Sequence, residues 1–277
     1  PSVRSPSEAK EPIVREIGSG VYLFDDYSVS SAYLIVGSQR CVVIDTGIGF
    51  ADFRSRIERY TQGKPVAAAL THGHIDHAGA ARQFETVYMH SGDLSLKYQQ
   101  YLPFRFLYTL FGLTPKLTQY GVSAFDISDK NNVASQTVAL EDGGVIDLGD
   151  RTLTFYFTPG HTQGSGCYLD SKTNILFAGD MTFSSVMLIF PESASVETYR
   201  ESLLKIYDLE SAAAAVHTGH SKAAQDPAVT LKLLDMTQQL LDESRSNALF
   251  PVIKKFDAPA QFADGSQHNV TLRYLTS

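Results

Sequence analysis

The chain has 277 residues, of which 43% are hydrophobic and 19% charged, and its formal net charge is −7. Such a composition is typical of a globular domain. The negative charge and the lack of a Lys- and Arg-rich run argue against nucleic acid as a partner. No stretch of about 18 or more apolar residues occurs, so we expect no membrane span. We expect a cytoplasmic location, with a removed N-terminal leader as the alternative.

The polar residues 1–12 predict a disordered tail, and we expect residues 13–277 to form a single domain. Hydrophobic periodicity and turn residues divide the first half into strands and helices. The predicted strands are a pair within 13–24 that turns at Ser19-Gly20, then 31–36, 41–45, 66–70 and 87–90. Helices are predicted over 51–61 and from 79 to 84.

An insertion follows over residues 91–135, and its first part, 93–113, is rich in Tyr, Phe and Leu. Pro103 should break this part into two short helices, and the polar residues 114–135 predict a loop. Two interpretations of the aromatic residues stay open. They form a lid over a functional site, or they are core residues or the surface through which a homodimer forms.

The second half again begins with strands and ends with helices, an order that suits a layered sandwich with sheets inside and helices outside. Cys41 and Cys167 both lie within apolar strands, which predicts buried thiols, with a disulfide as the alternative. Strands are predicted at 138–140, 144–148, 152–158, 166–169, 174–178 and 212–217, helices at 196–207 and 227–244, and a C-terminal hairpin at 264–266.

The most informative motif is the run Thr71-His72-Gly73-His74-Ile75-Asp76-His77. It follows an apolar strand and places three imidazoles and a carboxylate within six residues. Imidazole and carboxylate are ligands that suit zinc, iron and manganese. The run therefore predicts a metal site on the loop after a buried strand.

Three further candidate ligands also follow strand ends: His161 in Pro-Gly-His-Thr, Asp180 in Ala-Gly-Asp, and His220 in Thr-Gly-His. Side chains placed there converge at one edge of a sheet. Seven ligands are too many for one zinc ion, which takes three or four from protein. They fit two ions about 3.5–4 Å apart that share a bridging carboxylate and activate a hydroxide, and Asp180 is the natural bridge.

Taken in order, these elements resemble the metallo-β-lactamase superfamily, and the resemblance extends from about Val21 to Ser221, with Asp45 in Ile-Asp-Thr-Gly as a further match. It implies an α/β fold, a four-layer αββα sandwich, here with a helical aromatic insertion. It also implies a dinuclear site with the ligands divided as follows: His72, His74 and His161 for one ion, Asp76, His77 and His220 for the other, and Asp180 as the bridge. Asp45 would hold the ligands from behind, and Asp76 would orient the hydroxide. We expect two divalent ions, zinc in the first place, with iron or manganese as alternatives.

Positions where this sequence differs from individual branches of the superfamily indicate which branch it resembles most. Asp180 stands where true β-lactamases have no Asp, so the chain is more similar to glyoxalase II and the quorum-quenching lactonases. It differs from both. A short β-like tail with Lys254 and Lys255 replaces the helical region that binds glutathione, and Phe183 stands where those lactonases have Tyr.

The resemblance and these departures predict a hydrolase of a small ester, thioester or lactone with a hydrophobic group. The substrate is a small molecule, and its predicted pocket is formed by apolar residues after Asp180 and in the aromatic segment: Phe183, Met187, Phe190, Tyr101 and Phe104. Two alternatives remain. The same metal pair could cleave a phosphate ester or phosphodiester, or the site could be that of an iron-dependent oxygenase or redox protein.

Overall fold

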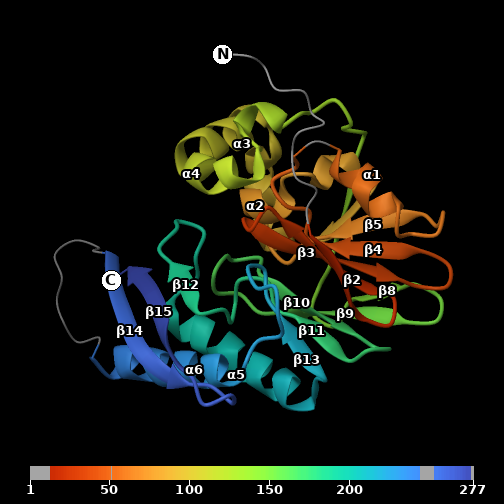
Figure 1. Ribbon diagram of the computed structural model, residues 1–277. Helices are drawn as coiled ribbons and strands as arrows, with labels where there is room; N and C mark the ends of the chain where they lie inside the picture. Colours follow the sequence, from red (N-terminus) through yellow and green to blue (C-terminus); the bar gives the residue numbers. More distant parts are fainter. Residues whose placement is uncertain (1–12, 51, 244–252, 276–277) are drawn as a thin grey trace. The chain divides into compact units, whose positions relative to one another are not determined.

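The computed structural model describes residues 13–50, 52–243 and 253–275. The predicted tail at 1–12, residue 51 of the first predicted helix, and Ser244 lie outside these residues. The chain divides into two compact units (Figure 1). Unit 1 comprises Pro1–Met89, Leu94–Ala139 and Asp147–Thr152, and unit 2 comprises His90–Asp93, Leu140–Ile146 and Leu153–Ser277.

Unit 1 is built on a seven-stranded sheet whose strands follow one another in chain order. The first four strands pair antiparallel and the last four pair parallel. The strands are β1 (Val14–Gly18), β2 (Val21–Asp26), β3 (Ser30–Val36), β4 (Cys41–Ile44), β5 (Val66–Ala69), β6 (Thr86–Met89) and β7 (Gln136–Ala139). Because β4 and β5 are parallel, with Ile44 opposite Ala69, the residues that follow them meet at one edge.

Helices of unit 1 pack on this sheet through buried apolar side chains, among them Phe53 and Ile57 of α1 (Phe53–Glu58). The predicted start of the next helix, at residue 79, is wrong. The structure has α2 (Ile75–Ala78) within the histidine run and a 3-10 turn at Ala81–Gln83. His74 is extended, with ψ 153°, and ends the loop, so helix geometry begins at the next residue.

The aromatic insertion is helical over more of its length than predicted. The predicted division beside Pro103 is confirmed, because a first helical piece ends at Gln100 and α3 (Leu102–Tyr108) begins after the extended Tyr101. Pro103 lies in the first turn of α3, where its missing N–H has no helical partner in any case. The predicted loop after residue 113 is wrong, because it contains further helical turns. The elements are 3-10 helix η3 (Ser91–Gln100), a π-helix (Thr109–Leu113), α4 (Thr114–Leu117), and 3-10 turns at Thr118–Tyr120 and Ala124–Asp126.

One cation anchors this insertion to the rest of unit 1. Arg105 of α3 is 1% exposed. Its guanidinium donates to the carbonyl oxygen of Ile48, at 3.2 Å, and to the carboxylate of Asp129. The apolar side chains of the insertion divide into two sets. Leu117, Val122 and Ile127 are buried in a core cluster, whereas Phe111 is 80% and Phe125 81% exposed.

Unit 2 contains a five-stranded sheet in the order β13-β11-β10-β9-β8 and a three-stranded sheet in the order β12-β15-β14. The strands are β8 (Val145–Asp147), β9 (Thr152–Phe157), β10 (Gly166–Asp170), β11 (Ile175–Phe177), β12 (Ser185–Leu188), β13 (Ala215–His217), β14 (Ile253–Gln261) and β15 (Gln267–Leu275). The predicted C-terminal hairpin is confirmed as β14 and β15. Strand β12 was not predicted.

Two helices, α5 (Val196–Ala212) and α6 (Ala228–Glu243), share one apolar core with these strands. Figure 1 shows α6 beside the β14–β15 hairpin, in agreement with their contacts. The strand predicted from residue 212 begins later, because α5 continues to Ala212. Cys41 and Cys167 are buried free thiols, as predicted, and burial raises the pKa of Cys167 to about 12.

The prediction of a mixed α/β fold with several sheets and helices is confirmed. None of the described helices combines the length and apolar character that a membrane crossing requires.

Candidate metal centre

The histidine run of unit 1 forms a compact group of side chains just beyond the end of β5. His72, His74 and His77 are 2%, 8% and 0% exposed. The ring centroid of His72 lies 4.8 Å from that of His74 and 4.2 Å from that of His77. Asp76 approaches the same group, with its Oδ2 atom 3.8 Å from Nε2 of His77. The run therefore brings its four predicted ligands together.

Asp45, the residue after β4, supports this group from one side. Its backbone has a φ of +58°, a conformation in which Asp is tolerated better than most residues. Its Oδ1 atom accepts a hydrogen bond from the backbone N–H of Thr71 at 2.8 Å, and its Oδ2 atom lies 2.9 Å from Nδ1 of His77. A carboxylate accepts only, so His77 donates from Nδ1 and presents Nε2 as a lone pair.

The Thr71 hydroxyl links Asp45 to a second imidazole, that of His72, by hydrogen bonds. The hydroxyl donates to Oδ2 of Asp45 at 2.8 Å, and Nδ1 of His72 lies 3.0 Å from that hydroxyl oxygen. Because the hydroxyl proton is directed at Asp45, the oxygen accepts from Nδ1–H of His72. One carboxylate thus sets the tautomer of two imidazoles, and both Nε2 atoms are left able to bind a metal.

Unit 2 contains a second group, formed by His161, Asp180 and His220. These residues follow β9, β11 and β13. Because β11 and β13 are parallel, with Phe177 opposite His217, Asp180 and His220 leave the sheet at the same edge. The Oδ2 atom of Asp180 lies 2.9 Å from Nε2 of His220 and 3.7 Å from Nε2 of His161. One carboxylate oxygen therefore faces two imidazoles, a suitable arrangement for a shared ligand.

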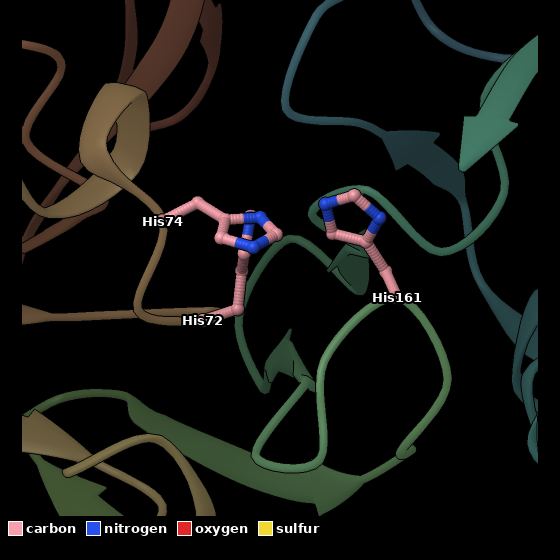
Figure 2. Close-up of side chains that lie close together, drawn as sticks. All are labelled: His72, His74 and His161. Atoms are coloured by element: carbon pink, nitrogen blue, oxygen red, sulfur yellow. The ribbon is translucent and has the colours of Figure 1, made fainter. Parts of the chain in front are cut away.

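The surroundings of this second group orient His161. Its Nδ1 atom lies 2.8 Å from the carbonyl oxygen of Met187 in β12 and donates to it, which again leaves Nε2 as a lone pair. Figure 2 shows the His161 ring on the loop after β9, and the His72 and His74 rings beside each other after β5. Phe190 meets the His161 ring edge to face at 5.8 Å, and Phe183 lies 5.1 Å from the His220 ring.

Tyr199 of α5 packs behind the second group. Its hydroxyl donates to the carbonyl oxygen of Met181 at 2.7 Å, and its ring fills the space in front of Gly160, where a Cβ atom would lie 2.5 Å from a ring carbon. Gly160 precedes His161 and Met181 follows Asp180, so the Tyr199 side chain contacts the loops that carry both of these candidate ligands. Burial raises the pKa of the Tyr199 phenol well above its ordinary value, so it stays a donor.

The residues of both groups fit divalent metal ions by their donor chemistry. The donors are imidazole nitrogen and carboxylate oxygen, which zinc, iron and manganese accept. Three of the imidazoles, in His72, His77 and His161, have Nδ1 engaged by an oxygen, the usual arrangement around metal-ligating histidines.

The predicted pocket residues divide between the units. Phe183, Phe190 and Met187 contact candidate ligands of unit 2, Met187 through its backbone carbonyl. Tyr101 and Phe104 lie in unit 1, 51% and 48% exposed. The Tyr101 ring lies 4.8 Å from the Arg82 guanidinium, and the Phe104 ring lies 5.0 Å from that of Tyr98.

Sequence reasoning missed three contributors: the Thr71 hydroxyl, the Met187 carbonyl and the Tyr199 phenol. The position of Thr71, inside the run and directly before the first predicted ligand, could have indicated that its hydroxyl contributes to the site. A backbone carbonyl has no such signal, because every residue carries one.

Comparison with known proteins places this geometry in a family. The family model described as Metallo-beta-lactamase superfamily matches residues 26–220. The acyl-coenzyme A thioesterase MBLAC2 of Gallus gallus is 28% identical over 210 residues, which are 70% of this chain and 74% of that protein. The hydroxyacylglutathione hydrolase of Salmonella paratyphi A is 28% identical over 170 residues, 61% of this chain and 53% of that protein.

Among solved structures, TTHA1623 in a di-iron-bound form matches with a TM-score of 0.53 and 22% identity, over 80% of this chain and 97% of that one. This likeness confirms the predicted metallo-β-lactamase fold.

Proposed function

Since the chain belongs to the metallo-beta-lactamase superfamily and is a metal-dependent hydrolase, we propose that it cleaves a thioester whose acyl group is hydrophobic. The observation that carries the choice of substrate is the similarity to acyl-coenzyme A thioesterase along most of both chains. The fold alone does not select a substrate. Simple esters and lactones present the same carbonyl carbon to a nucleophile, and they are secondary substrates under this proposal.

The metal-binding roles proposed are those that the resemblance implies. His72, His74 and His161 would hold one divalent ion, Asp76, His77 and His220 would hold the other, and Asp180 would be shared between them. The imidazole and carboxylate donors, the tautomers described above and the shared Oδ2 contacts of Asp180 support this assignment. Zinc is the first candidate, and iron is supported by the di-iron-bound form of TTHA1623.

Two such ions supply Lewis acidity and a nucleophilic water at neutral pH. The chain's own residues orient the reactants. Asp76, partly exposed beside His77, orients the attacking water and accepts its proton. Asp45 and Thr71 keep His72 and His77 in the tautomers that bind metal. The rings of Phe183 and Phe190 exclude bulk water around His220 and His161 and contact the acyl group.

The aromatic segment, residues 93–113, is proposed to hold the far end of the acyl chain. Its exposed apolar side chains include Tyr98, Phe104, Leu107 and Phe111, and such a patch on a protein surface marks a binding site for apolar groups. A homodimer through the same residues remains the competing prediction, and the chain-length dependence described in the Discussion separates the two.

The test combines metal analysis with a substrate panel. Purified protein is assayed for bound metals and for hydrolysis of long- and short-chain acyl-coenzyme A, a lactone and a phosphodiester. We expect the long-chain thioester to have the highest kcat/KM. H72A and D180N should lose bound metal and turnover together, whereas H268A, at an exposed histidine of β15, should lose neither. Faster turnover of the phosphodiester, or near-normal activity of D180N, would overturn the proposal.

A further inference from the structure

Unit 1 has a cavity of about 260 Å³ beside the edge of its sheet, distinct from the histidine run. Its walls come from strands β6 and β7, from the segment before β7, and from the two 3-10 helices η2 (Ala81–Gln83) and η3. Nothing in the hydrolytic site described above uses its polar side chains. The cavity is large enough for a phosphate-bearing fragment and smaller than the pockets of about 300–1,000 Å³ that enclose whole drug-sized ligands.

The cavity is cationic in a chain that is acidic overall. Its lining includes Arg82 and Lys97, and none of its lining residues, all within the described part of the chain, is acidic. The nearest carboxylate that faces Arg82 is Asp129, at 3.7 Å, and that carboxylate also accepts from the buried Arg105. Asp129 is therefore shared between two guanidinium groups, and Arg82 keeps positive charge for a ligand.

The donors of the cavity are held in place. Lys97 donates to the Thr137 hydroxyl at 2.7 Å, which uses one of its three N–H bonds. The Arg82 guanidinium lies over the Tyr101 ring, 4.8 Å from its centroid, a cation–π contact that helps to hold it in place. Gln100, 4% exposed, adds an amide. A planar guanidinium fork and an ammonium point charge are the usual pair for phosphate oxygens.

The cavity is connected to the histidine run by the same helix that lines it. Gln99 of η3 accepts a hydrogen bond from the backbone N–H of Ile75, inside the run, at 3.1 Å. Its neighbours Lys97, Gln100 and Tyr101 line the cavity. The helix thus contacts the histidine run through Gln99 and lines the cavity through Lys97 and Gln100, and Tyr101 follows directly after it. A ligand in the cavity is therefore held at a fixed position relative to the histidine run.

We propose that this cavity binds phosphate groups at the far end of the thioester's thiol half, as in the phosphorylated nucleotide of coenzyme A. The identity of the ligand rests on the proposed function. The existence of the site does not, because the cationic cavity is observed independently of any substrate. Arg82 and Lys97 are the specificity-determining residues, and Tyr101 offers its ring face to the ligand.

Binding is measured first, without catalysis. Isothermal titration with adenosine 3′,5′-bisphosphate and with pyrophosphate is carried out on the metal-loaded wild type, K97M and K97R, and on D180N as purified. A lost charge-assisted hydrogen bond should weaken bisphosphate binding by about tenfold or more in K97M, with recovery in K97R. D180N should bind as the wild type does, which separates the cavity from the metal ligands. K116M removes a lysine of α4 outside the cavity and should change nothing.

Kinetics then connect the cavity to the substrate. The KM of an acyl-coenzyme A is compared with that of the same acyl group on N-acetylcysteamine, a thiol without phosphate. We expect K97M to raise the KM for the acyl-coenzyme A, relative to the KM for the N-acetylcysteamine thioester, by about tenfold. K116M should leave this ratio unchanged. R82Q should act in the same direction as K97M.

The possible failures are distinguishable. If wild type hydrolyses neither thioester, the proposed function fails, whereas the titration still decides whether the cavity binds phosphate. If both thioesters are hydrolysed and K97M leaves the ratio unchanged, this inference fails and the proposed function stands. Binding of pyrophosphate but not of the bisphosphate would overturn the nucleotide assignment, and binding of neither would overturn the site.

Discussion

Replacing Asp45 with Asn tests whether one buried carboxylate sets the metal affinity of the histidine run. Asn has the same shape and tolerates the positive φ of this position. Its carbonyl oxygen can still accept from the Thr71 N–H. Its amide nitrogen, however, offers hydrogen where Oδ2 of Asp45 now accepts from the Thr71 hydroxyl and from Nδ1 of His77.

The expected consequence reaches two imidazoles. Facing an N–H donor, His77 turns its lone pair to Nδ1 and carries its proton on Nε2, where the metal would bind. The Thr71 hydroxyl, having lost its acceptor, becomes free to donate to Nδ1 of His72, with the same result. Loss of a supporting partner of this kind typically weakens metal binding about 10- to 100-fold, which corresponds to about 1.4–2.7 kcal/mol.

The assay is competition for zinc between the protein and a chelator of known affinity, after circular dichroism has shown that the D45N variant is folded. T71V removes the hydroxyl contacts with Asp45 and His72 but keeps the contact between Asp45 and His77, so it should weaken binding less. T71S, which keeps the hydroxyl, should match the wild type. An unchanged zinc Kd in folded D45N would refute the reasoning, because the tautomers would then not depend on Asp45.

Three further predictions concern packing, pH and the acyl chain. G79A should lower the free energy of unfolding by about 1–3 kcal/mol, because the added Cβ would lie 2.3 Å from the Ile48 carbonyl oxygen; urea denaturation measures it. Burial raises the pKa of Glu210 to about 7 from its ordinary 4.5, so the folded chain holds a proton that the unfolded chain releases. The stability that Glu210 contributes is complete below pH 4.5 and is lost as pH rises through 7, by up to about 3 kcal/mol, and E210Q should remove this slope in denaturation at pH 5.5 and 8. F104A should raise KM for a long acyl chain about tenfold relative to a short one, since burying a Phe contributes about 1.5–3 kcal/mol.

Each of these has a matched control. G112A adds the same methyl group where no atom lies within 4 Å and should stabilise its helical turn. E201Q, at an exposed glutamate of the same helix as Glu210, should keep the pH slope, and an unchanged slope in E210Q would remove Glu210 as its source. If F104A alters the oligomeric state on gel filtration but not the chain-length preference, the aromatic segment is a dimer surface.

How far the sequence predicted the molecule depended on how local each signal was. The histidine run, the strand before it and the strand ends that precede Asp180 and His220 were predictable, because each signal lies within a few residues of the feature. The start of α2 was not. The run looks like a loop followed by a small-residue helix, yet its last two candidate ligands, Asp76 and His77, already lie in that helix.

Non-local pairing accounts for most of what was missed. Strand β12 is only four residues long, and the sequence around it shows no clear alternation of polar and apolar residues. It forms because β15, far along the chain, pairs with it in parallel. The cationic cavity likewise combines Arg82, Lys97 and Thr137 from three separate segments. No window of sequence contains them together, so only the folded chain shows that the charges of Arg82 and Lys97 line one cavity.

The pairing of β12 with β15 gives the end of the chain an unexpected influence. Met187, whose carbonyl directs His161, lies opposite Arg273, and β14 then braces β15 over its whole length. The β14–β15 hairpin contains none of the candidate ligands, yet it holds the strand whose carbonyl orients His161. A substitution that weakens the β12–β15 pairing would therefore act on the orientation of His161 although every candidate ligand is unchanged.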